Sequence, residues 1–324
     1  MFSRVNVFFM RVPTQIFCLF FIWFCEMIVS ENILCQAKQR RVDLIGDLAF
    51  ERGISVRDPK EGVDNRCGTI YFGKPSDEPP LWILSQWASR YNLCGEELQK
   101  GRRGERFYEN EGKRVSVFPG GRFRLEIRTK PEYGERVRQF YQSWPHLYVE
   151  QPVEPGIPLG RCQALRYTLS ARLLYCKNYM GDAFDPNIHT CHVVSHVAVQ
   201  NRNPESEYYL KSFLLSIPVY DYRYPFPPGE HFVDAGTKEV VTNLFVYGPA
   251  GDRLWNGPIS SGNWQRAEAD LLPYVKEAVG LAGWAGSSLD DWQITYFIMG
   301  WESEGTFDAA LEFKNLRLQA VIEE

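Results

Sequence analysis

The sequence has no large excess of charge of either sign: 36 Lys and Arg stand against 40 Asp and Glu, a formal net charge of −4. Binding to nucleic acid requires clustered Lys and Arg that neutralise phosphates, so this balance predicts no nucleic-acid partner. The chain also lacks internal repeats, low-complexity tracts and any Asn-x-Ser/Thr glycosylation sequence. With 26 Gly, 20 Pro and 15% aromatic residues, it is neither a coiled coil nor a disordered or collagen-like chain.

An apolar run long enough to span a membrane is also missing. The run at residues 16–25 has 10 residues and ends at Glu26, whereas a membrane-spanning helix needs roughly 20. Arg4 and Arg11 precede it and give the basic start typical of a secretory signal peptide. The sequence therefore predicts a secreted or extracytoplasmic protein, in the periplasm or at the cell surface, with no membrane span after the signal is removed.

The signal peptide is expected to cover residues 1–30, with cleavage after Ser30 or as late as Ala37. Both positions place a small residue before the cut. Residues 38–324 are expected to form a single domain of all-β type.

Cysteine pairing depends on the cleavage site. The later cut removes Cys35 and leaves five cysteines. The earlier cut leaves six: Cys35, Cys67, Cys94, Cys162, Cys176 and Cys191. Export leads to an oxidising compartment, where disulfides form. We predict a Cys176–Cys191 disulfide, because these residues close a 14-residue segment between two strand-like runs. Cys67 with Cys94 is a second pair, and free buried thiols are the alternative.

The hydrophobic pattern repeats with a period of two. In residues 123–127 and 165–175, apolar residues alternate with charged or hydroxyl side chains, as in strands with one buried face. About eleven such runs, joined by Gly, Pro, Asn and Asp, predict a jelly-roll or concanavalin A-like β-sandwich. The stretch 269–283 alone has a helical period, with Asp270 as a cap, and predicts one peripheral helix. The charged stretch 96–114 is expected to be an exposed excursion.

Residues 121–128, GRFRLEIR, begin with Gly-Arg-Phe. This resembles a strand entry of concanavalin A-like lectins and glucanases, and Arg124-x-Glu126-x-Arg128 is similar to the Arg-x-Glu-x-Arg strand of alginate-lyase-type jelly rolls. Side chains at i, i+2 and i+4 share one face of a strand. The resemblance implies that Arg124 and Arg128 bind substrate; the alternative is a solvated face with cross-strand ion pairs.

Residues 143–151, SWPHLYVEQ, resemble the Trp-Pro-Glu-Ile-Asp strand of family 16 glucanases. In that pattern, His146 takes the position of the nucleophile, Tyr148 takes that of the Asp, and Gln151 stands where the acid should be. A retaining glycosidase needs two carboxylates roughly 5 Å apart, and this strand offers only Glu150. The hydrolase mechanism is therefore not carried over.

The same strand still presents His146, Tyr148 and Glu150 on one face, with Trp144 before them. We take these three as catalytic candidates and Trp144 as a substrate-binding residue. A polysaccharide lyase abstracts a proton with Tyr or His while Arg neutralises the uronate, so the set suits a lyase. The alternative is that they bind sugar or pack.

His189, His192 and His196 lie within eight residues of one another. The surrounding valines predict a strand, on which His192 and His196 would lie roughly 13 Å apart and could not share one metal ion. They are expected to line a ligand groove. Asp182, Asp185 and Asn187 could supply oxygen ligands to a structural calcium, although turn chemistry explains them equally well. No cofactor is required.

Aromatic residues crowd the second half of the chain, and Tyr222, between Asp221 and Arg223, is a substrate-binding candidate because sugar rings stack on exposed aromatic rings. Glu302, at a strand end, would supply a second carboxylate if the fold placed it near Glu150 or Asp221.

The sequence as a whole predicts a secreted β-sandwich that recognises extracellular polysaccharide as a carbohydrate-binding module. A polysaccharide lyase or an atypical glycoside hydrolase using the same groove is the alternative, and a structural envelope protein is the second alternative. The oligomeric state is left open.

Overall fold

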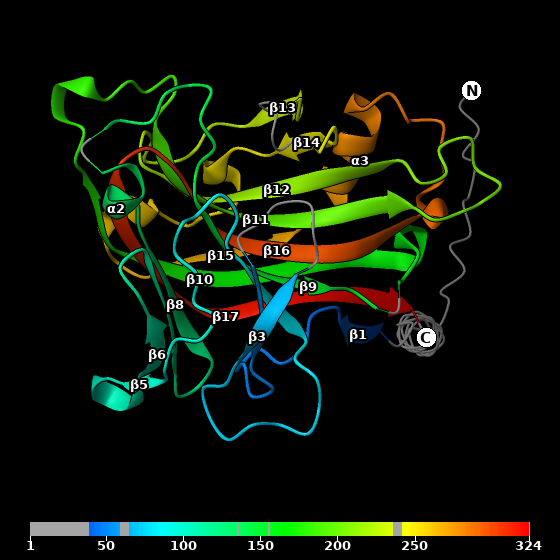
Figure 1. Cartoon of the computed structure of the whole chain (residues 1–324). Helices are drawn as coiled ribbons and strands as arrows, with labels where there is room; N and C mark the ends of the chain where they lie inside the picture. The colour runs from blue at the N-terminus through cyan, green and yellow to red at the C-terminus, as the bar shows by residue number, and fades with distance from the viewer. Residues whose placement is uncertain (1–38, 59–64, 135, 155, 236–241, 324) are drawn as a thin grey trace, which may run out of the picture. The chain divides into compact units, whose positions relative to one another are not determined.

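The computed structural model describes residues 39–58, 65–134, 136–154, 156–235 and 242–323 (Figure 1). The chain divides into two units, residues 1–40 with 323–324 and residues 41–322, and nearly all of the sheet structure belongs to the second. The predicted signal peptide and both of its cleavage sites lie outside the described residues. None of the helices in the described ranges has the length and apolar character needed to cross a membrane.

The strands of the second unit form two sheets. An eight-stranded sheet has the order β15-β10-β17-β8-β7-β6-β5, with β1 also paired to β17. Its strands are β1 (Gln39–Asp43), β5 (Gln99–Lys100), β6 (Arg106–Glu109), β7 (Lys113–Phe118), β8 (Arg122–Arg128), β10 (Cys162–Asn178), β15 (Gln265–Asp270) and β17 (Phe307–Glu323).

A nine-stranded sheet has the order β13-β14-β12-β11-β16-β9-β4-β2-β3. Its strands are β2 (Ile54–Arg57), β3 (Arg66–Ile70), β4 (Trp82–Ser85), β9 (His146–Pro152), β11 (Thr190–Asn201), β12 (Ser212–Asp221), β13 (Glu230–Val233), β14 (Phe245–Gly248) and β16 (Trp292–Glu304). The central strands β12, β11, β16 and β9 pair antiparallel to one another, and they carry the candidate site.

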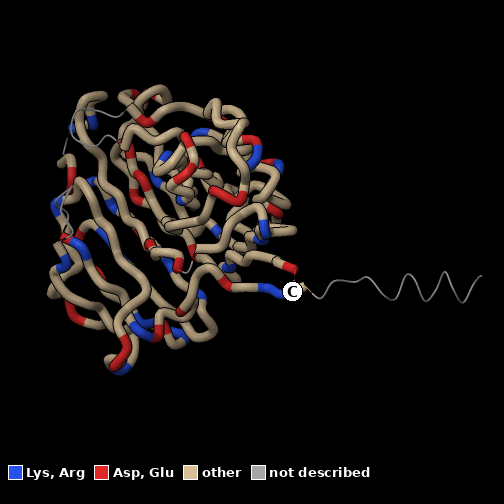
Figure 2. Tube along the Cα trace, turned by 90° about the vertical axis from the view of Figure 1, so that its right-hand side faces the viewer, with Lys and Arg blue, Asp and Glu red and all other residues tan. Residues whose placement is uncertain are grey.

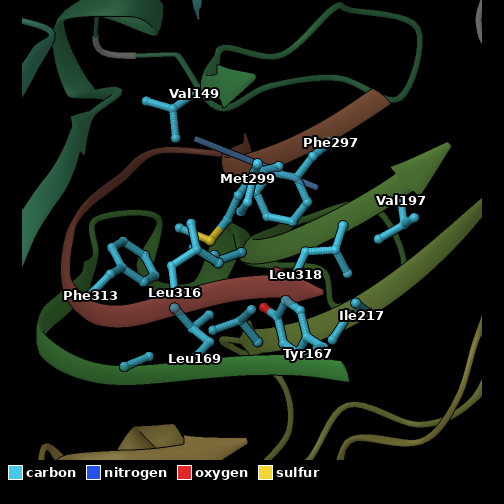
Figure 3. Close-up of a cluster of buried hydrophobic side chains, with 14 of the residues drawn as sticks. Val149, Tyr167, Leu169, Val197, Ile217, Phe297, Met299, Phe313, Leu316 and Leu318 are labelled. Carbon is cyan, nitrogen blue, oxygen red and sulfur yellow. The ribbon is translucent and has the colours of Figure 1, made fainter. Parts of the chain in front are cut away.

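The two sheets pack face to face through the alternate apolar residues of their strands. Figure 3 shows Val197 and Phe297 from one sheet and Leu318 from the other in the same buried cluster. A hydrogen bond of 2.9 Å between the hydroxyls of Tyr167 and Ser195 also crosses the core. These contacts confirm the predicted all-β jelly-roll sandwich.

The remaining residues of each strand face outward. On β11, Val193, Val197 and Val199 are fully buried, whereas His192 and His196 are only partly buried. The period of two therefore fixes both the core and the side chains available to a ligand.

One longer helix, α3 (Leu272–Leu281), confirms the helix predicted at 269–283, although it is shorter at both ends. Asp270 Oδ1 accepts hydrogen bonds from the backbone N–H groups of Leu272 at 3.1 Å and Leu165 at 2.8 Å, so it ties the start of the helix to β10. The other helical segments are α2 (Lys130–Tyr133) and the 3-10 turns η1 (Arg102–Gly104), η2 (Leu159–Arg161), η3 (Gly181–Ala183), η4 (Gly251–Arg253), η5 (Ile259–Ser261) and η6 (Leu289–Asp291).

The stretch 96–114 is not the exposed excursion that its charges predicted. It contains β5, β6 and the start of β7, and Phe107 and Tyr108 are buried. Lys113 is buried as well, whereas the Arg114 guanidinium covers the Phe107 ring at 3.6 Å. Because long charged side chains can cover apolar rings, a strand of this kind contains many charged residues and does not show the hydrophobic alternation by which strands are predicted.

The predicted Cys176–Cys191 disulfide is not formed in this structure, where both thiols are free. Burial, and then the neighbouring Cys176 thiol, raises the pKa of the Cys191 thiol well above its ordinary value. Because Cys176 belongs to β10 and Cys191 to β11, a bond between them would join the two sheets. Cys67 and Cys94 are likewise free, and burial, and then the Cys67 thiol, raises the pKa of the Cys94 thiol.

We expect Cys176 and Cys191 to form a disulfide when the folded protein is equilibrated with glutathione disulfide, each bond consuming one oxidant molecule and releasing two glutathione thiols. The raised thiol pKa makes the reaction slow, since the thiolate is the attacking species. Peptide mapping by mass spectrometry without reduction detects the linked peptides. Cys162, which is also free and buried, is the internal control. Alkylation of both thiols after long oxidation would show that the pair does not close.

Candidate functional site

A cavity of about 620 Å³ lies on the outer face of the nine-stranded sheet. Outward-facing residues of β9, β11, β12, β13, β14 and β16 line it, together with the segments that follow β12 and precede β9. Its volume falls within the range of small-molecule sites, which is roughly 300–1,000 Å³. The cavity is therefore the candidate functional site.

The carboxylate of Glu302 is the centre of the polar end of this cavity. Strand register places Glu302 of β16 directly between His146 of β9 and His192 of β11. The Nε2 atoms of His146 and His192 each lie 3.5 Å from a carboxylate oxygen, and that of His196 lies 4.0 Å away. Trp144 Nε1–H donates to the carboxylate at 3.0 Å, and the Tyr148 hydroxyl donates to it as well.

Electrostatics hold this cluster in a charged state. Burial alone would raise the pKa of the Glu302 carboxyl, but the charge on His192 and hydrogen bonds from His146, His192 and His196 hold it well below its usual range. Burial would lower the pKa of His192, yet the Glu302 charge and hydrogen bond raise it to about 9. Glu302 and His192 therefore form an ion pair at neutral pH.

Two further carboxylates flank the cluster. Glu304, two residues along the same face of β16, has its pKa raised by burial and by the charge of Glu302, against the lowering effect of His192. Asp221 of β12 pairs in register with His192, and its carboxylate accepts two hydrogen bonds from the Arg223 guanidinium, at 2.7 and 3.0 Å. Burial would raise the pKa of Asp221, but the Arg223 hydrogen bonds and the His192 charge lower it.

Aromatic rings enclose the polar end of the cavity. The Trp87 ring lies 5.8 Å from the rings of both His146 and Tyr148, and the Trp144 ring stacks on His146 at 5.7 Å. Gly300 lies opposite Tyr148 in register, where a Cβ atom would come within 2.0 Å of the Leu147 carbonyl oxygen. This close approach of β16 to β9 requires glycine.

Two nitrogen atoms of the cluster have no partner. Among the described residues, nothing forms a hydrogen bond with Nδ1 of His146 or with Nδ1 of His196, and both atoms are buried. Unpaired buried polar atoms are costly and rare, so they mark a place where a ligand or water completes the hydrogen bonding.

Five of the nine predicted catalytic and substrate-binding residues are brought together. Trp144, His146, Tyr148, His192 and His196 all line the cavity. Glu150 shares their face of β9, but it lies in register with Ile298, four residues from Glu302 along β16, and its carboxylate pairs with the Arg57 guanidinium at 2.5 Å. The fold therefore does not place Glu150 beside Glu302. Asp221 does not adjoin Glu302 either, because β11 with His192 lies between the strands that carry these two carboxylates.

Arg124 and Arg128 lie in the other sheet, so the prediction that they share a site with His146 is wrong. Their strand, β8, turns Leu125 and Ile127 into the core and its arginines outward. Arg124 pairs with Glu312 at 2.9 Å and Arg128 with Glu109 at 2.8 Å, which confirms the alternative of cross-strand ion pairs. Figure 2 shows basic and acidic positions interspersed along the chain trace.

Two other predicted groups lie outside the cavity. The Tyr222 ring packs against Phe307 at 5.0 Å and is not among the lining residues, whereas Tyr224 is. Asp185 Oδ1 accepts hydrogen bonds from the backbone and side-chain N–H groups of Asn187, at 2.9 and 2.8 Å, as turn chemistry predicts. The described ranges contain no group of three His, Cys, Asp or Glu side chains placed to hold a metal ion. Calcium binding by Asp182, Asp185 and Asn187 stays a prediction.

Glu304 and Trp87 were not predicted as site residues, and Glu302 was noted only as an acid at a strand end. The one sequence signal for Glu302 and Glu304 is that two charged side chains occupy alternate positions near the end of a largely apolar strand, in Trp301-Glu302-Ser303-Glu304. Trp87 follows β4, two residues after the end of the strand.

Comparison with known proteins gives similarity in structure alone. No protein-family model matches the chain, and no curated protein matches its sequence. Among solved structures, a family 12 xyloglucanase from Bacillus licheniformis in complex with ligand has 9% identity and a TM-score of 0.41, covering 73% of this chain and 99% of its own. A cellulase derived from Cel12A of Rhodothermus marinus has 12% identity and a TM-score of 0.40, over 73% and 99%. The family 11 xylanase of Neocallimastix patriciarum has 10% identity and a TM-score of 0.37, covering 70% of this chain and 96% of its own. Similarity at this level carries no argument about activity, so any function must be argued from the cavity.

Proposed function

We propose that the protein binds a neutral glycan in the cavity of the nine-stranded sheet. The observation that carries this proposal is the pair of unpartnered Nδ1 atoms on His146 and His196. The Nε2 atoms of His146 and His196 lie 3.5 and 4.0 Å from Glu302, which only accepts hydrogen bonds, and this arrangement favours the tautomer with the proton on Nε2. In that tautomer Nδ1 is an acceptor, which donors such as sugar hydroxyls satisfy.

The aromatic rings support the same ligand class. Trp87 and Trp144 line the cavity beside the histidines, and the apolar face of a pyranose packs well on such rings. Hydroxyl donors and an aromatic surface together are what a sugar residue requires.

The charges of the cavity disfavour a uronate ligand. Among the described residues that line it, Arg223 is the one arginine or lysine, and Asp221 already holds its guanidinium. His192 is paired with Glu302. A polysaccharide lyase must neutralise the uronate carboxylate, and no uncommitted cation of the described lining is available for that role. A neutral glycan therefore fits better than an anionic one.

Glycoside cleavage is the second candidate, favoured by Glu302 and Glu304. Both side chains lie on one face of β16 at i and i+2, about 7 Å apart at Cα. The pKa of Glu302 is lowered and that of Glu304 is raised, and carboxyl groups driven apart in this way serve as base and acid in glycosidases. Glu304 would protonate the leaving oxygen and Glu302 would act as base or nucleophile.

Secretion belongs to the proposal on sequence grounds alone, from the apolar run at 16–25. An extracytoplasmic location gives the cavity access to extracellular polysaccharide.

The test is titration of the purified protein with neutral β-glucan, xylan and xyloglucan oligosaccharides and with uronate oligosaccharides, followed by calorimetry. We expect neutral oligosaccharides to bind and uronates not to bind. His146→Ala and His196→Ala should each weaken binding about tenfold, the value of one lost hydrogen bond in a buried site. His231→Ala on the exposed strand β13 is the matched control and should bind as the original does.

Reducing ends measured in the same mixtures separate the two candidates. New ends that disappear in Glu304→Gln identify a glycosidase, and binding without new ends identifies a binding module. Binding of uronates in place of neutral glycans would overturn the proposal. No binding to any glycan would overturn it too and favour the structural envelope role.

A further inference from the structure

The middle of the cavity has an apolar floor that a sugar chain alone does not explain. Five lining side chains on neighbouring outward positions are aliphatic or proline: Val194, Leu214, Pro218, Val246 and Ile298. The register places Val194 beside Pro218, and Leu214 beside Val246. We call these five residues the apolar floor.

Outward faces of a sandwich are normally polar. The other sheet follows this rule, since its outward face carries the ion pairs of Arg122, Arg124 and Arg172 with Glu312. In the described part of the chain, no side chain of the apolar floor belongs to the hydrophobic core between the sheets. Val194, Leu214 and Ile298 are only partly buried. The floor is an apolar surface inside a cavity of ligand size.

The apolar floor is continuous with the polar cluster. Val194 lies between His192 and His196 on the same face of β11, and His196 pairs in register with Ile298. One strand spacing, about 4.8 Å, separates β11 from Leu214 on β12, and a second one reaches Val246. A ligand whose sugar contacts His196 therefore extends over the floor within a few ångströms.

We infer that the glycan bound in this cavity carries an uncharged apolar substituent, an alkyl or aryl group, that lies on the apolar floor. This inference rests on the proposed function and specifies its ligand class. Apart from the Ser216 hydroxyl, which lies between Leu214 and Pro218, the floor offers no polar side chain among the described residues, so most hydroxyl groups of a further sugar would lose water there without gaining partners. A hydrocarbon group gains from burial there. Glu230 and Asp234 line the cavity on either side of Phe232, at the β13 edge of the sheet, so a negatively charged group at the end of the substituent is disfavoured.

The test compares methyl, butyl, hexyl and octyl β-glycosides of glucose, xylose and galactose, below their micelle concentrations, by calorimetry. Affinity should rise about two- to fourfold for each added methylene until the floor is covered, because a fully buried methylene contributes about 0.8 kcal/mol. Leu214→Asn and Val246→Thr should each flatten this rise. Leu281→Asn, at the exposed end of α3, is the matched control and should keep the full rise.

Each outcome separates the inference from the proposed function. Equal affinity for methyl and octyl glycosides would overturn the apolar-substituent inference and leave glycan binding intact. Binding of octanol as tightly as octyl glycoside, unaffected by His196→Ala, would overturn the proposed function. A rise with chain length that survives both Leu214→Asn and Val246→Thr would place the alkyl group elsewhere and overturn the inference.

Discussion

Replacing Glu302 by glutamine is expected to lower the free energy of unfolding by about 4 kcal/mol at pH 7 and to abolish ligand binding. Breaking a buried ion pair by removing one partner leaves the other charge without compensation, which typically costs 3–5 kcal/mol. Here the carboxylate also accepts hydrogen bonds from Trp144 and Tyr148. A glutamine amide presents two donors toward a ring of donors, so several of these interactions are lost at once.

Chemical denaturation at pH 7 measures the loss. Glu268→Gln is the control, because Glu268 is exposed on β15 and its ion pair with Arg266 is a surface pair. Such pairs contribute roughly 0–1 kcal/mol, so this variant should unfold almost as the original does. If Glu302→Gln were no less stable than Glu268→Gln, the cluster would not hold the cavity together.

The fold class was predictable because one property, the alternation of apolar residues, decides it. Phe123, Leu125 and Ile127 on β8 predicted a buried face, and each is buried. Alternation shows which residues share a face of one strand, but it does not show to which sheet that strand belongs. For this reason the sequence predicts one site for Arg124 and His146, which are 22 residues apart, although they lie on opposite outer faces of the sandwich.

The candidate site was predictable by residue type but not by arrangement. His146, Tyr148, His192 and His196 stood out as polar residues in apolar strands, and they do line the cavity. Their common partner, Glu302, comes from β16, which the strand order inserts between β9 and β11. That order depends on packing of the entire sandwich. The sequence alone therefore could not show that the Glu302 carboxylate lies within 4.0 Å of three histidine rings.

Raising the pH from about 6.5 to 9 is expected to remove about 3 kcal/mol of stability through His192. The Glu302 charge raises the pKa of His192 from 6.5 to about 9, against the effect of burial. Between these values the folded protein binds more protons than the unfolded chain, so its stability falls as pH rises and is complete only below pH 6.5. Glu302 has the opposite shift, so its contribution is present above pH 4.5 and is lost as the pH falls.

A second buried group, Lys113, makes stability rise with pH over part of the same range. The effect of His192 must therefore be measured as the difference between the original protein and a His192 variant. Burial lowers the pKa of Lys113 from 10.5 to about 7, against the raising effect of Glu132. The folded protein then binds fewer protons than the unfolded chain between these values, and stability rises with pH there. Denaturation of the original protein and of His192→Asn from pH 5 to 9.5 isolates the histidine. The unfolding free energies of the original protein and of His192→Asn should converge toward pH 9. In a Lys113→Met background, the decrease in the free energy of unfolding with rising pH should become steeper. Parallel curves would mean that folding does not raise the pKa of His192.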